Sequence, residues 1–379
     1  MNVEQEAQVV GQDRVAADAE GERIYVASQW QLIRWRFAHH KVAVFSLGVL
    51  IALYAVVLFA EFFAPYDPRR TDTDWMLAPP QRVHIFRDGR LHRPYVLGMT
   101  WEMDPQTFGI TYEVDPTQVS PIYWFSRGDS YKLWELFETD LHLFGVQEGT
   151  VFLLGTDTMG RDLLSRIVHG GRLSLSVGLL GIAISFMLGI TIGGFSGYFG
   201  GVFDTASQRV IEFIRSIPTL PLWMALSVSL PKGWSVTRVY FAIVVILSLV
   251  GWTGLARVVR GRFMSLRSED FVMAARISGS SEPRIIFRHM LPSFTSHIIA
   301  SLTLSIPGMI LGETSLSFIG LGLQAPAISW GVLLKDAQHI RVLATAPWLL
   351  MPGAFIVIAI LAFNFLGDGL RDAADPYAR

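Results

Sequence analysis

The chain alternates between long apolar runs and polar segments, and this pattern predicts a helical membrane protein. About 20 apolar residues in an α-helix span the roughly 30 Å of hydrocarbon in a bilayer. Runs that approach this length occupy 42–60, 173–203, 216–231, 239–256, 289–312 and 342–367. The run 216–231 is the shortest, and it has Pro218 and Pro221 near its start. We therefore expect an all-α polytopic membrane protein with six transmembrane helices, the first of which covers 42–64.

Lys and Arg are unevenly distributed among the short loops, and this predicts the orientation because cytoplasmic loops carry an excess of positive charge. With the N-terminus inside, the cytoplasmic segments hold 16 Lys and Arg residues and the short outer loops hold 4. The long segment after the first helix is left out of this comparison, since long segments are translocated largely regardless of charge. We expect both termini and the loop 257–292 to lie in the cytoplasm.

The polar segment 65–153 separates the first two apolar runs and predicts an external domain. It is rich in aromatic residues, which include Trp75, Trp101, Trp124 and Trp134. The residues around Asp88-Gly89 alternate between apolar and polar, which predicts a β-hairpin with a tight turn. The segment that begins at Ser130 has the spacing of a short amphipathic helix. We therefore expect an α+β insert, and a disordered loop is the alternative.

Residues 1–41 precede the first apolar run and divide into two parts. The first 24 residues are polar and acidic, a composition typical of poorly ordered tails. Residues 25–41 combine aromatic side chains with basic ones, which favours a helix that lies in the membrane interface. A cytoplasmic flank that carries the usual positive charge is the alternative.

The segment 268–292 lies between the fourth and fifth apolar runs and reads SEDFVMAARISGSSEPRIIFRHMLP. It predicts two short helices separated at Gly279, because glycine readily takes the left-handed conformation that ends a helix. Ser268 and Ser281 are expected to cap the two helices. One face of the first helix carries Phe271, Ala274, Ala275 and Ser278. Such small side chains would let another surface approach closely, and an ordinary helix-turn-helix connector is the alternative.

Several kinds of catalytic and binding motif are missing from the sequence. The chain has no cysteine, which excludes disulfides and thiolate metal ligands, and its nine histidines lack metal-like spacing. It has no G-x-x-x-x-G-K-[ST] motif for nucleotide phosphates and no G-x-S-x-G or H-E-x-x-H motif of hydrolases. The net charge of −1 gives no sign of a nucleic-acid partner. We expect no catalytic residue and no metal site.

Charged residues are scarce in the predicted helices, which argues against an ion-driven pump. Glu313, at the end of the fifth run, is the main candidate for a functional charge, and Ser315 and Ser317 follow it. We treat these three residues as candidates for gating or for lining a pathway. A proton relay through Glu313 is the alternative.

The segment 268–292 resembles the EAA loop of bacterial ABC importer permeases, whose pattern is E-A-A-x-x-x-G-x9-I-x-L-P. Ala274, Ala275, Gly279, Leu291 and Pro292 match this pattern, whereas Met273 and His289 replace its Glu and Ile. The run IIFRHMLP is similar to the oligopeptide/dipeptide/nickel branch of that family. So are LGTDTMGRDLLSRIVHGGRLSL, GYFGGVFD, SIPTLP, ETSLSFIGLGLQAPAISWG and GDGLRDAADP, in that order along the chain.

The resemblance implies a type I ABC importer permease fold over 154–379 and a coupling helix that docks on a cytoplasmic ATPase subunit. Phe271 would be an apolar anchor, and the small residues Ala274, Ala275 and Gly279 would permit close approach. Basic residues of the loop would pair with acidic groups of the ATPase: Arg276, Arg284 and Arg288. Met273 would remove one charge of the family pattern from this contact.

The implied partners are a second homologous permease, two ABC ATPase subunits, an extracytoplasmic binding protein and the lipid of a bacterial cytoplasmic (inner) membrane. ATP and Mg would bind to the ATPase subunits, so the chain itself would hold no cofactor and would not be an enzyme. With the second permease it would form a pathway for di- or oligopeptides. A non-peptide solute (a nickel complex, an opine or a sugar) and an ion-coupled secondary transporter are the alternatives. Four glycines would either line the pathway or allow close helix packing: Gly178, Gly181, Gly189 and Gly193.

Overall fold

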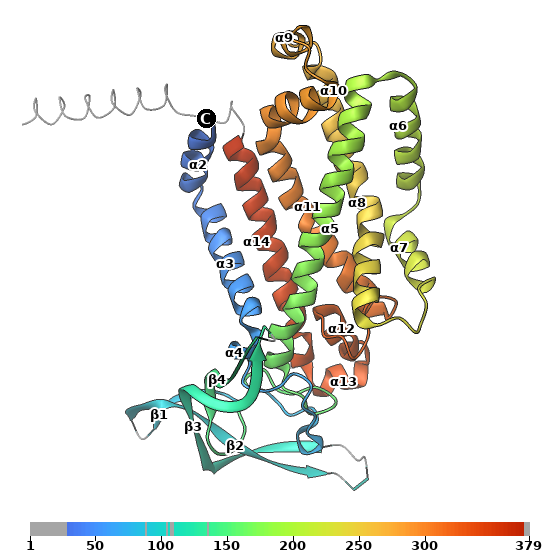
Figure 1. Cartoon of the computed structure of the whole chain (residues 1–379). Helices are drawn as coiled ribbons and strands as arrows, with labels where there is room; N and C mark the ends of the chain where they lie inside the picture. Colours follow the sequence, from blue (N-terminus) through green and yellow to red (C-terminus); the bar gives the residue numbers. More distant parts are fainter. Residues whose placement is uncertain (1–28, 88, 104, 107–109, 135, 375–379) are drawn as a thin grey trace, which may run out of the picture.

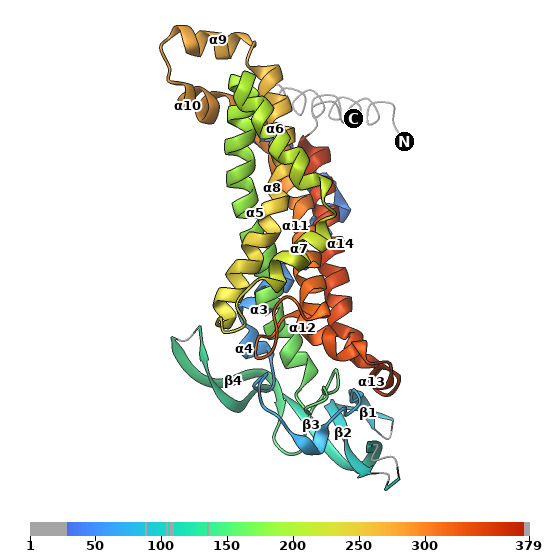
Figure 2. The same ribbon diagram turned by 90° about the vertical axis from the view of Figure 1, so that its right-hand side faces the viewer.

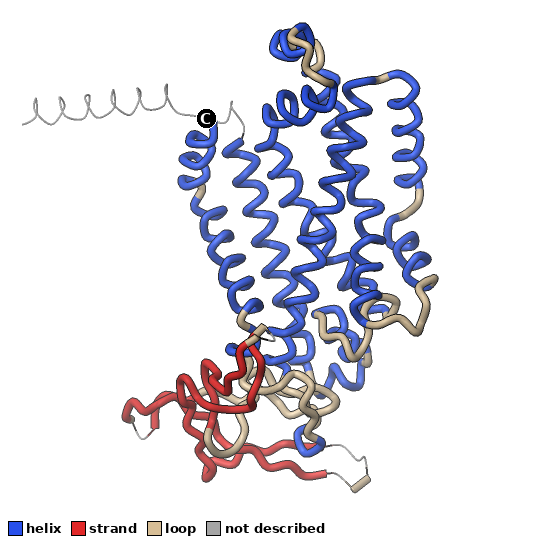
Figure 3. Tube along the Cα trace, viewed as in Figure 1, coloured by secondary structure: helices blue, strands red, loops and turns tan. Residues whose placement is uncertain are grey.

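The computed structural model describes residues 29–87, 89–103, 105–106, 110–134 and 136–374 of the chain. Figure 1 shows a bundle of long helices with a small β-sheet at one end, and Figure 3 shows that the strands are confined to that end. Five helices of this described part are long and apolar enough to cross a membrane. Their main parts are α3 (Lys41–Leu58), α5 (Leu163–Phe199), α8 (Val236–Leu266), α11 (Thr295–Ile319) and α14 (Met351–Ala374).

Helix α5 begins well before the apolar run that predicted it, at Leu163 instead of 173. The side chain of Asp162 caps it by accepting a hydrogen bond from the Ser165 N–H at 2.7 Å. Such a cap satisfies a backbone donor that would otherwise lack a partner in the first turn. The polar residues of this first turn concealed the start of the helix from the hydrophobic pattern.

Helix α14 begins later than its apolar run, at Met351 instead of 342. The residues between form two short helices, α13 (Ile340–Thr345) and η5 (Pro347–Leu350). Ala346 lies between them with a non-helical backbone, because the ring of Pro347 disfavours the helical conformation in the preceding residue.

The expected transmembrane helix over 216–231 is wrong as a single element. The structure has α6 (Gly201–Ser216) followed by the ten-residue helix α7 (Thr219–Val228). Ile217 is extended between them, since it precedes Pro218. Figure 1 and Figure 2 show α6 and α7 following one another along α8, so this part of the chain is a broken helix and α7 alone is too short to span.

At the N-terminal side, α2 (Gln29–His39) leads into α3 in nearly the same direction (Figure 1). Trp30 and Trp35 on α2 are exposed, as a helix in the membrane interface requires, and that placement stays a prediction. Residues 1–28 lie outside the described part. The short helix α4 (Ala60–Phe63) follows α3 and begins the passage to the insert.

The insert is a four-stranded antiparallel sheet with strand order β1-β2-β3-β4. Its strands are β1 (His84–Arg87), β2 (Arg90–Met103), β3 (Ile110–Leu133) and β4 (Phe137–Val146), and one 3₁₀ turn, η1 (Thr73–Trp75), precedes them. Arg87 pairs with Arg90 across a two-residue turn, which confirms the predicted hairpin around Asp88-Gly89.

The helix predicted from Ser130 is wrong, because that segment forms the end of β3 and the whole of β4. Tyr131 pairs with Thr139, and Lys132 pairs with Glu138, so that opposite charges face each other across the strands. Aromatic residues pack well on a pleated surface, and here pairing between strands overrides a local helical spacing. The described part of the insert is therefore built on strands, not on an α+β arrangement.

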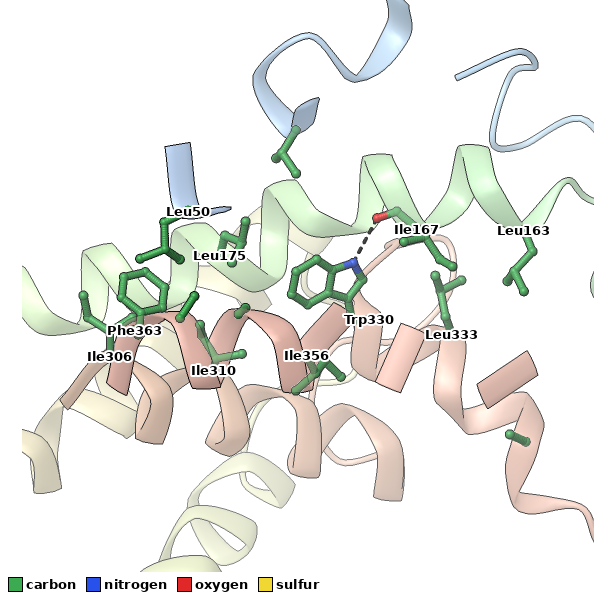
Figure 4. Packing of buried hydrophobic residues seen from close by; sticks show 14 of the residues in the cluster. Leu50, Leu163, Ile167, Leu175, Ile306, Ile310, Trp330, Leu333, Ile356 and Phe363 are labelled. Carbon is green, nitrogen blue, oxygen red and sulfur yellow. Dashed lines mark hydrogen bonds between the residues drawn. The ribbon is translucent and has the colours of Figure 1, made fainter. Parts of the chain in front are cut away.

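The main core joins α3, α5, α11 and α14, and it extends from the middle of the bundle to the end nearest the sheet. Figure 4 shows Leu50, Leu175, Ile306 and Phe363 meeting there from four different helices. The Trp330 indole N–H donates to the Ile167 carbonyl at 2.9 Å, which anchors the short helix α12 (Trp330–Lys335) and the turn η4 (Asp336–Gln338) to α5.

Glycines allow α5 to lie directly against its neighbours. A Cβ at Gly193 would lie 2.4 Å from the Ala256 carbonyl of α8, and one at Gly197 would lie 2.5 Å from the Arg260 carbonyl. Gly178 and Gly181 face α11, where a Cβ would meet the side chains of Ile306 at 2.9 Å and Met309 at 3.3 Å. These contacts favour close helix packing as the role of these glycines, and Gly189, whose Cβ would lie 2.8 Å from the Leu255 side chain, fits the same interpretation.

Candidate functional site

The segment 268–292 projects from the end of the bundle that is opposite the sheet (Figure 1, Figure 2). It contains α9 (Asp270–Ile277), α10 (Glu282–Arg284), the π-helical turn η2 (Ile285–Met290) and the 3₁₀ turn η3 (Leu291–Phe294). Pro292 lies where the winding changes, because it lacks an N–H and its ring clashes with the carbonyl four residues before it.

The predicted break at Gly279 is confirmed, since its φ is +75°. The caps differ from the prediction. Glu269, not Ser268, is the N-cap residue of α9, and the Ser268 hydroxyl lies 3.5 Å from the Ser265 carbonyl. Ser281 is the N-cap residue of α10 as predicted, but its side chain makes no capping hydrogen bond.

Helix α9 has one face toward the bundle and one toward solvent. Val272 and Ala275 are buried and belong to a cluster with Ile285 and Ile286, whereas Ile277 is 85% exposed. The expectation that Ala275 contributes to an external docking face is therefore wrong, because its small side chain lets α9 pack against its own chain. The other residues predicted to form the coupling loop are exposed: Phe271, Met273, Ala274, Arg276, Gly279, Arg284, Arg288 and Pro292.

Arg276 connects α9 to the end of α5. Its guanidinium donates to the Tyr198 hydroxyl at 2.9 Å and lies 5.4 Å from the centre of the ring. The hydrogen bond raises the pKa of Arg276, so the group stays charged. This residue thus has a partner within the chain, and a displacement of α9 reaches α5 directly.

A second polar connection lies at the same end of the bundle. Arg260 on α8 donates to Asp204 on α6, with 2.6 Å between Nη2 and Oδ2. The Ser196 hydroxyl on α5 donates to the same carboxylate. Three helices are thereby held together next to the projecting segment.

Glu313 is fully buried at the junction of α11, α5 and α12. Its Oε1 accepts hydrogen bonds from Ser317 and Ser329, both at 2.8 Å, and its Oε2 accepts one from Ser174 at 3.2 Å. The Ser329 and Ser174 oxygens in turn accept from the first N–H groups of α12. Hydrogen bonds from several donors compensate a buried carboxylate for its loss of contact with water. Because Ser174 lies on α5 and Ser329 precedes α12, this cluster joins both helices to α11.

The structure therefore brings Glu313 and Ser317 together, and both side chains are fully buried. Ser315 is half-buried on the same helix. The sequence interpretation missed Ser174 and Ser329. These serines belong to motifs that are far apart in the sequence, and serine is too common a residue for its position alone to indicate a role. Only the folding of α12 against α5 reveals them.

Two cavities open at the sheet end of the bundle. One of about 660 Å³ lies between the α7–α8 connection and the loop 320–326. Another of about 670 Å³ lies between the insert and the bundle, lined by charges of both signs that include Asp67, Lys132 and Arg172. Among the described residues, no group of His, Asp or Glu could hold a metal ion.

Comparison with known proteins decides the class of this molecule. Residues 189–379 match the family described as binding-protein-dependent transport system inner membrane component. Residues 28–80 match the N-terminal TM domain of oligopeptide transport permease C. The chain belongs to the binding-protein-dependent permease family. It is thus a multi-span inner-membrane component of an ABC transport system, and a transport component rather than an enzyme.

Curated relatives of this permease include one protein that matches nearly all of it. The oligopeptide transport system permease protein OppC of Haemophilus influenzae is 33% identical over 97% of this chain and 94% of its own length. The dipeptide transport system permease protein DppC of Bacillus subtilis is 40% identical over 59% of this chain and 68% of its own. Among solved structures, a chain of the MetNI methionine ABC transporter in an inward-facing conformation has 16% identity and a TM-score of 0.43, over 55% of this chain and 96% of that one.

Proposed function

We propose that this permease forms, with a second homologous permease, the translocation pathway of an ATP-driven importer of di- or oligopeptides. The names of its relatives support the peptide substrate, since permeases of dipeptide and oligopeptide systems are similar to it over most of their length. In this proposal a binding protein delivers the peptide, and two ATPase subunits bind ATP and Mg. The N- and C-termini lie in the cytoplasm.

The exposed face of α9 is the observation that carries the proposal. Phe271 and Met273 are each 42% exposed, and Ile277 is 85% exposed, at the tip of a segment that projects beyond the bundle. Apolar side chains displayed together in this way favour a protein partner. In the proposed orientation the insert is outside, so α9 faces the cytoplasm and its partner is an ATPase subunit.

Movement of the ATPase would reach the membrane helices through two sets of contacts within this chain. The Arg276–Tyr198 hydrogen bond connects α9 to α5, and the buried Val272 packs α9 against η2, which leads into α11. Packed cores shift between discrete arrangements rather than deform smoothly, so the docked helix acts as a lever in alternating access.

We also propose that α6 and α7 together make the sixth crossing. The two helices follow each other along α8 and are interrupted only at Ile217 and Pro218. Backbone groups freed at such a break are tolerated within a membrane where neighbouring helices cover them.

Variants of Gly279 test the docking site. A Cβ at this position would meet no atom within 4 Å, so an added methyl group leaves the packing of the chain intact and strains only the left-handed backbone, by about 1–2 kcal/mol. Gly279→Ala adds this strain alone. Gly279→Arg adds the same strain and a long charged side chain next to the apolar face of α9.

We expect both variants to insert into the membrane, and only Gly279→Arg to lose co-purification of the ATPase subunits and uptake of a labelled tripeptide by the reconstituted transporter. Wild-type uptake by Gly279→Arg would show that α9 is not the docking site. A wild-type complex that hydrolyses ATP with its binding protein but takes up no peptide would instead contradict the substrate class.

A further inference from the structure

Helix α6 carries a row of polar side chains that the described part of the chain leaves uncovered. Four polar residues recur at intervals of four, three and four, which places them on one face of the helix: Thr205, Arg209, Glu212 and Ser216. All four are exposed, and Figure 1 shows α6 at the outer edge of the bundle. Ile211 lies on the opposite face and is fully buried. We call the four polar residues the α6 polar row.

The α6 polar row extends to the depth of the hydrocarbon core. Ile211 packs with Trp252 and Ala256 of α8, which belong to the charge-free run 239–256. Helix α6 runs from the α9 end of the bundle toward the sheet end (Figure 1). Because a helix rises about 1.5 Å per residue, Ser216 lies roughly 7 Å farther from the α9 end than Ile211 does. The row therefore lies beside a part of α8 that has the composition of a membrane span.

The charged residues of the row are unsuited to contact with lipid. Arg209 donates to the Glu212 carboxylate at 2.8 Å, and 77% of the arginine side chain and 47% of the glutamate side chain are exposed. Ionisable groups within membrane-spanning segments almost always face a protein interior or a water-filled cavity. The outer side of this ion pair must therefore meet water or another subunit.

The break after α6 favours water on the same side. Ile217 is extended and α7 begins at Thr219, so the first N–H groups of α7 have no preceding helical turn to bond with. Helix α8 lies on one side of the break, whereas Ser216, Pro218 and Thr219 are exposed on the other. At membrane depth, irregular backbone is tolerated only where protein covers it or where it lines a water-filled cavity.

An apolar face lies next to the α6 polar row on the same helix. Val210 and Phe213 are 52% and 69% exposed, and the helical repeat places both to one side of the row. Helix α6 thus has two exposed faces of different chemistry. This division is expected of a helix that stands between an apolar surrounding and a hydrated space.

We propose that the α6 polar row lines the water-filled translocation pathway and contacts the charged termini of the peptide that passes through it. This inference rests on the proposed function, in which a peptide crosses between two permeases. A peptide has an ammonium group and a carboxylate, and Glu212 and Arg209 supply the opposite charges side by side. Because an exposed ion pair is weak, its members can exchange partners with the peptide, which favours passage over tight binding.

Two cysteine variants compare the row with its apolar neighbour. The chain has no cysteine, so Ser216→Cys and Phe213→Cys each give the full chain a single thiol. Both residues are exposed, and Ser216 lies nearly one turn deeper from the α9 end, so access from that membrane surface would favour position 213. Each variant is assembled into the complete transporter in lipid nanodiscs. The measurement is the rate at which a charged, water-soluble methanethiosulfonate modifies this chain.

We expect the thiol at 216 to react about tenfold faster than the thiol at 213, because the thiolate that reacts forms in water and not in an apolar surrounding. Equal rates at the two positions, or a faster reaction at 213, would overturn the proposal. Equally slow rates would mean that lipid or the second permease covers both faces, and equally fast rates would mean that α6 lies outside the membrane.

A substrate peptide provides the second part of the test. Trialanine delivered by the binding protein during ATP hydrolysis should slow the reaction at 216 about twofold or more, in proportion to the time that it occupies the pathway. Uptake of trialanine without this protection would place the pathway elsewhere and overturn the proposal. If 216 reacts rapidly but no trialanine is taken up, the peptide substrate of the proposed function is contradicted, whereas the pathway assignment is supported.

Discussion

Replacing Gly193 with alanine would place a methyl group between α5 and α8, where the two backbones touch. The new Cβ would lie 2.4 Å from the Ala256 carbonyl oxygen and 2.9 Å from its Cα, whereas ordinary contact begins at 3.4 Å. The helices would have to separate by roughly 1 Å, because both neighbours are backbone atoms and cannot rotate away. Overpacking of this kind costs about 1–3 kcal/mol, and the better helix propensity of alanine returns at most about 1 kcal/mol.

Thermal unfolding of the purified permease complex in detergent measures this effect. We expect Gly193→Ala to lower the apparent Tm by a few degrees. Gly261→Ala is the matched control, since Gly261 lies in the same helix pair and a Cβ there would meet no atom within 4 Å. That variant should raise the apparent Tm slightly, because glycine in a helix interior is less favourable than alanine by up to about 1 kcal/mol.

The reasoning is refuted if the two alanine variants shift the apparent Tm in the same direction and by the same amount. Such a result would mean that α5 and α8 have room between them at Gly193. The glycines on α5 would then have to be explained by the translocation pathway, the other interpretation of the sequence.

Two further predictions concern buried carboxylates. Burial raises the pKa of Asp162 to about 6, whereas its unfolded value is about 3.9. The folded protein therefore binds this proton more tightly than the unfolded protein does. The free energy of unfolding should fall as pH rises from 4 to 6, by about 3 kcal/mol at most. Asp162→Asn keeps the cap of α5 and should remove this slope from Tm against pH; a slope that persists would assign it to another group. Glu313→Gln should retain transport, because an amide oxygen can still accept hydrogen bonds from Ser317 and Ser329. Glu313→Ala leaves these buried hydroxyls without an acceptor and should lower the free energy of unfolding by about 3–5 kcal/mol. Loss of uptake in a stable Glu313→Gln protein would favour a proton relay instead.

Features that depend on neighbouring residues could be predicted from the sequence. The apolar runs located the long helices, since a bilayer demands continuous apolar length. Asp88-Gly89 located the turn of a hairpin, and Gly279 located the end of α9 through its positive φ. In each case the cause lies within a few residues of the effect.

Features that depend on distant partners were decided by the tertiary structure. The segment after Ser130 has a helical spacing, but β3 and β4 pair with each other and make it a hairpin. Ala275 was placed on a docking face, although Ile285 and Ile286 bury it, and Arg276 is held by Tyr198 instead of being left for an acidic partner.

The sequence by itself thus determined that this chain crosses a membrane and carries the permease motifs, because both properties depend only on which residues are close to one another along the chain. The tertiary structure decided what each motif residue contacts. Glu313 illustrates the difference, since its acceptor role depends on Ser174 and Ser329, which are 139 and 16 residues away along the chain. Such a contact stabilises the protein only when three helices are packed together, so no single segment of the sequence can reveal it.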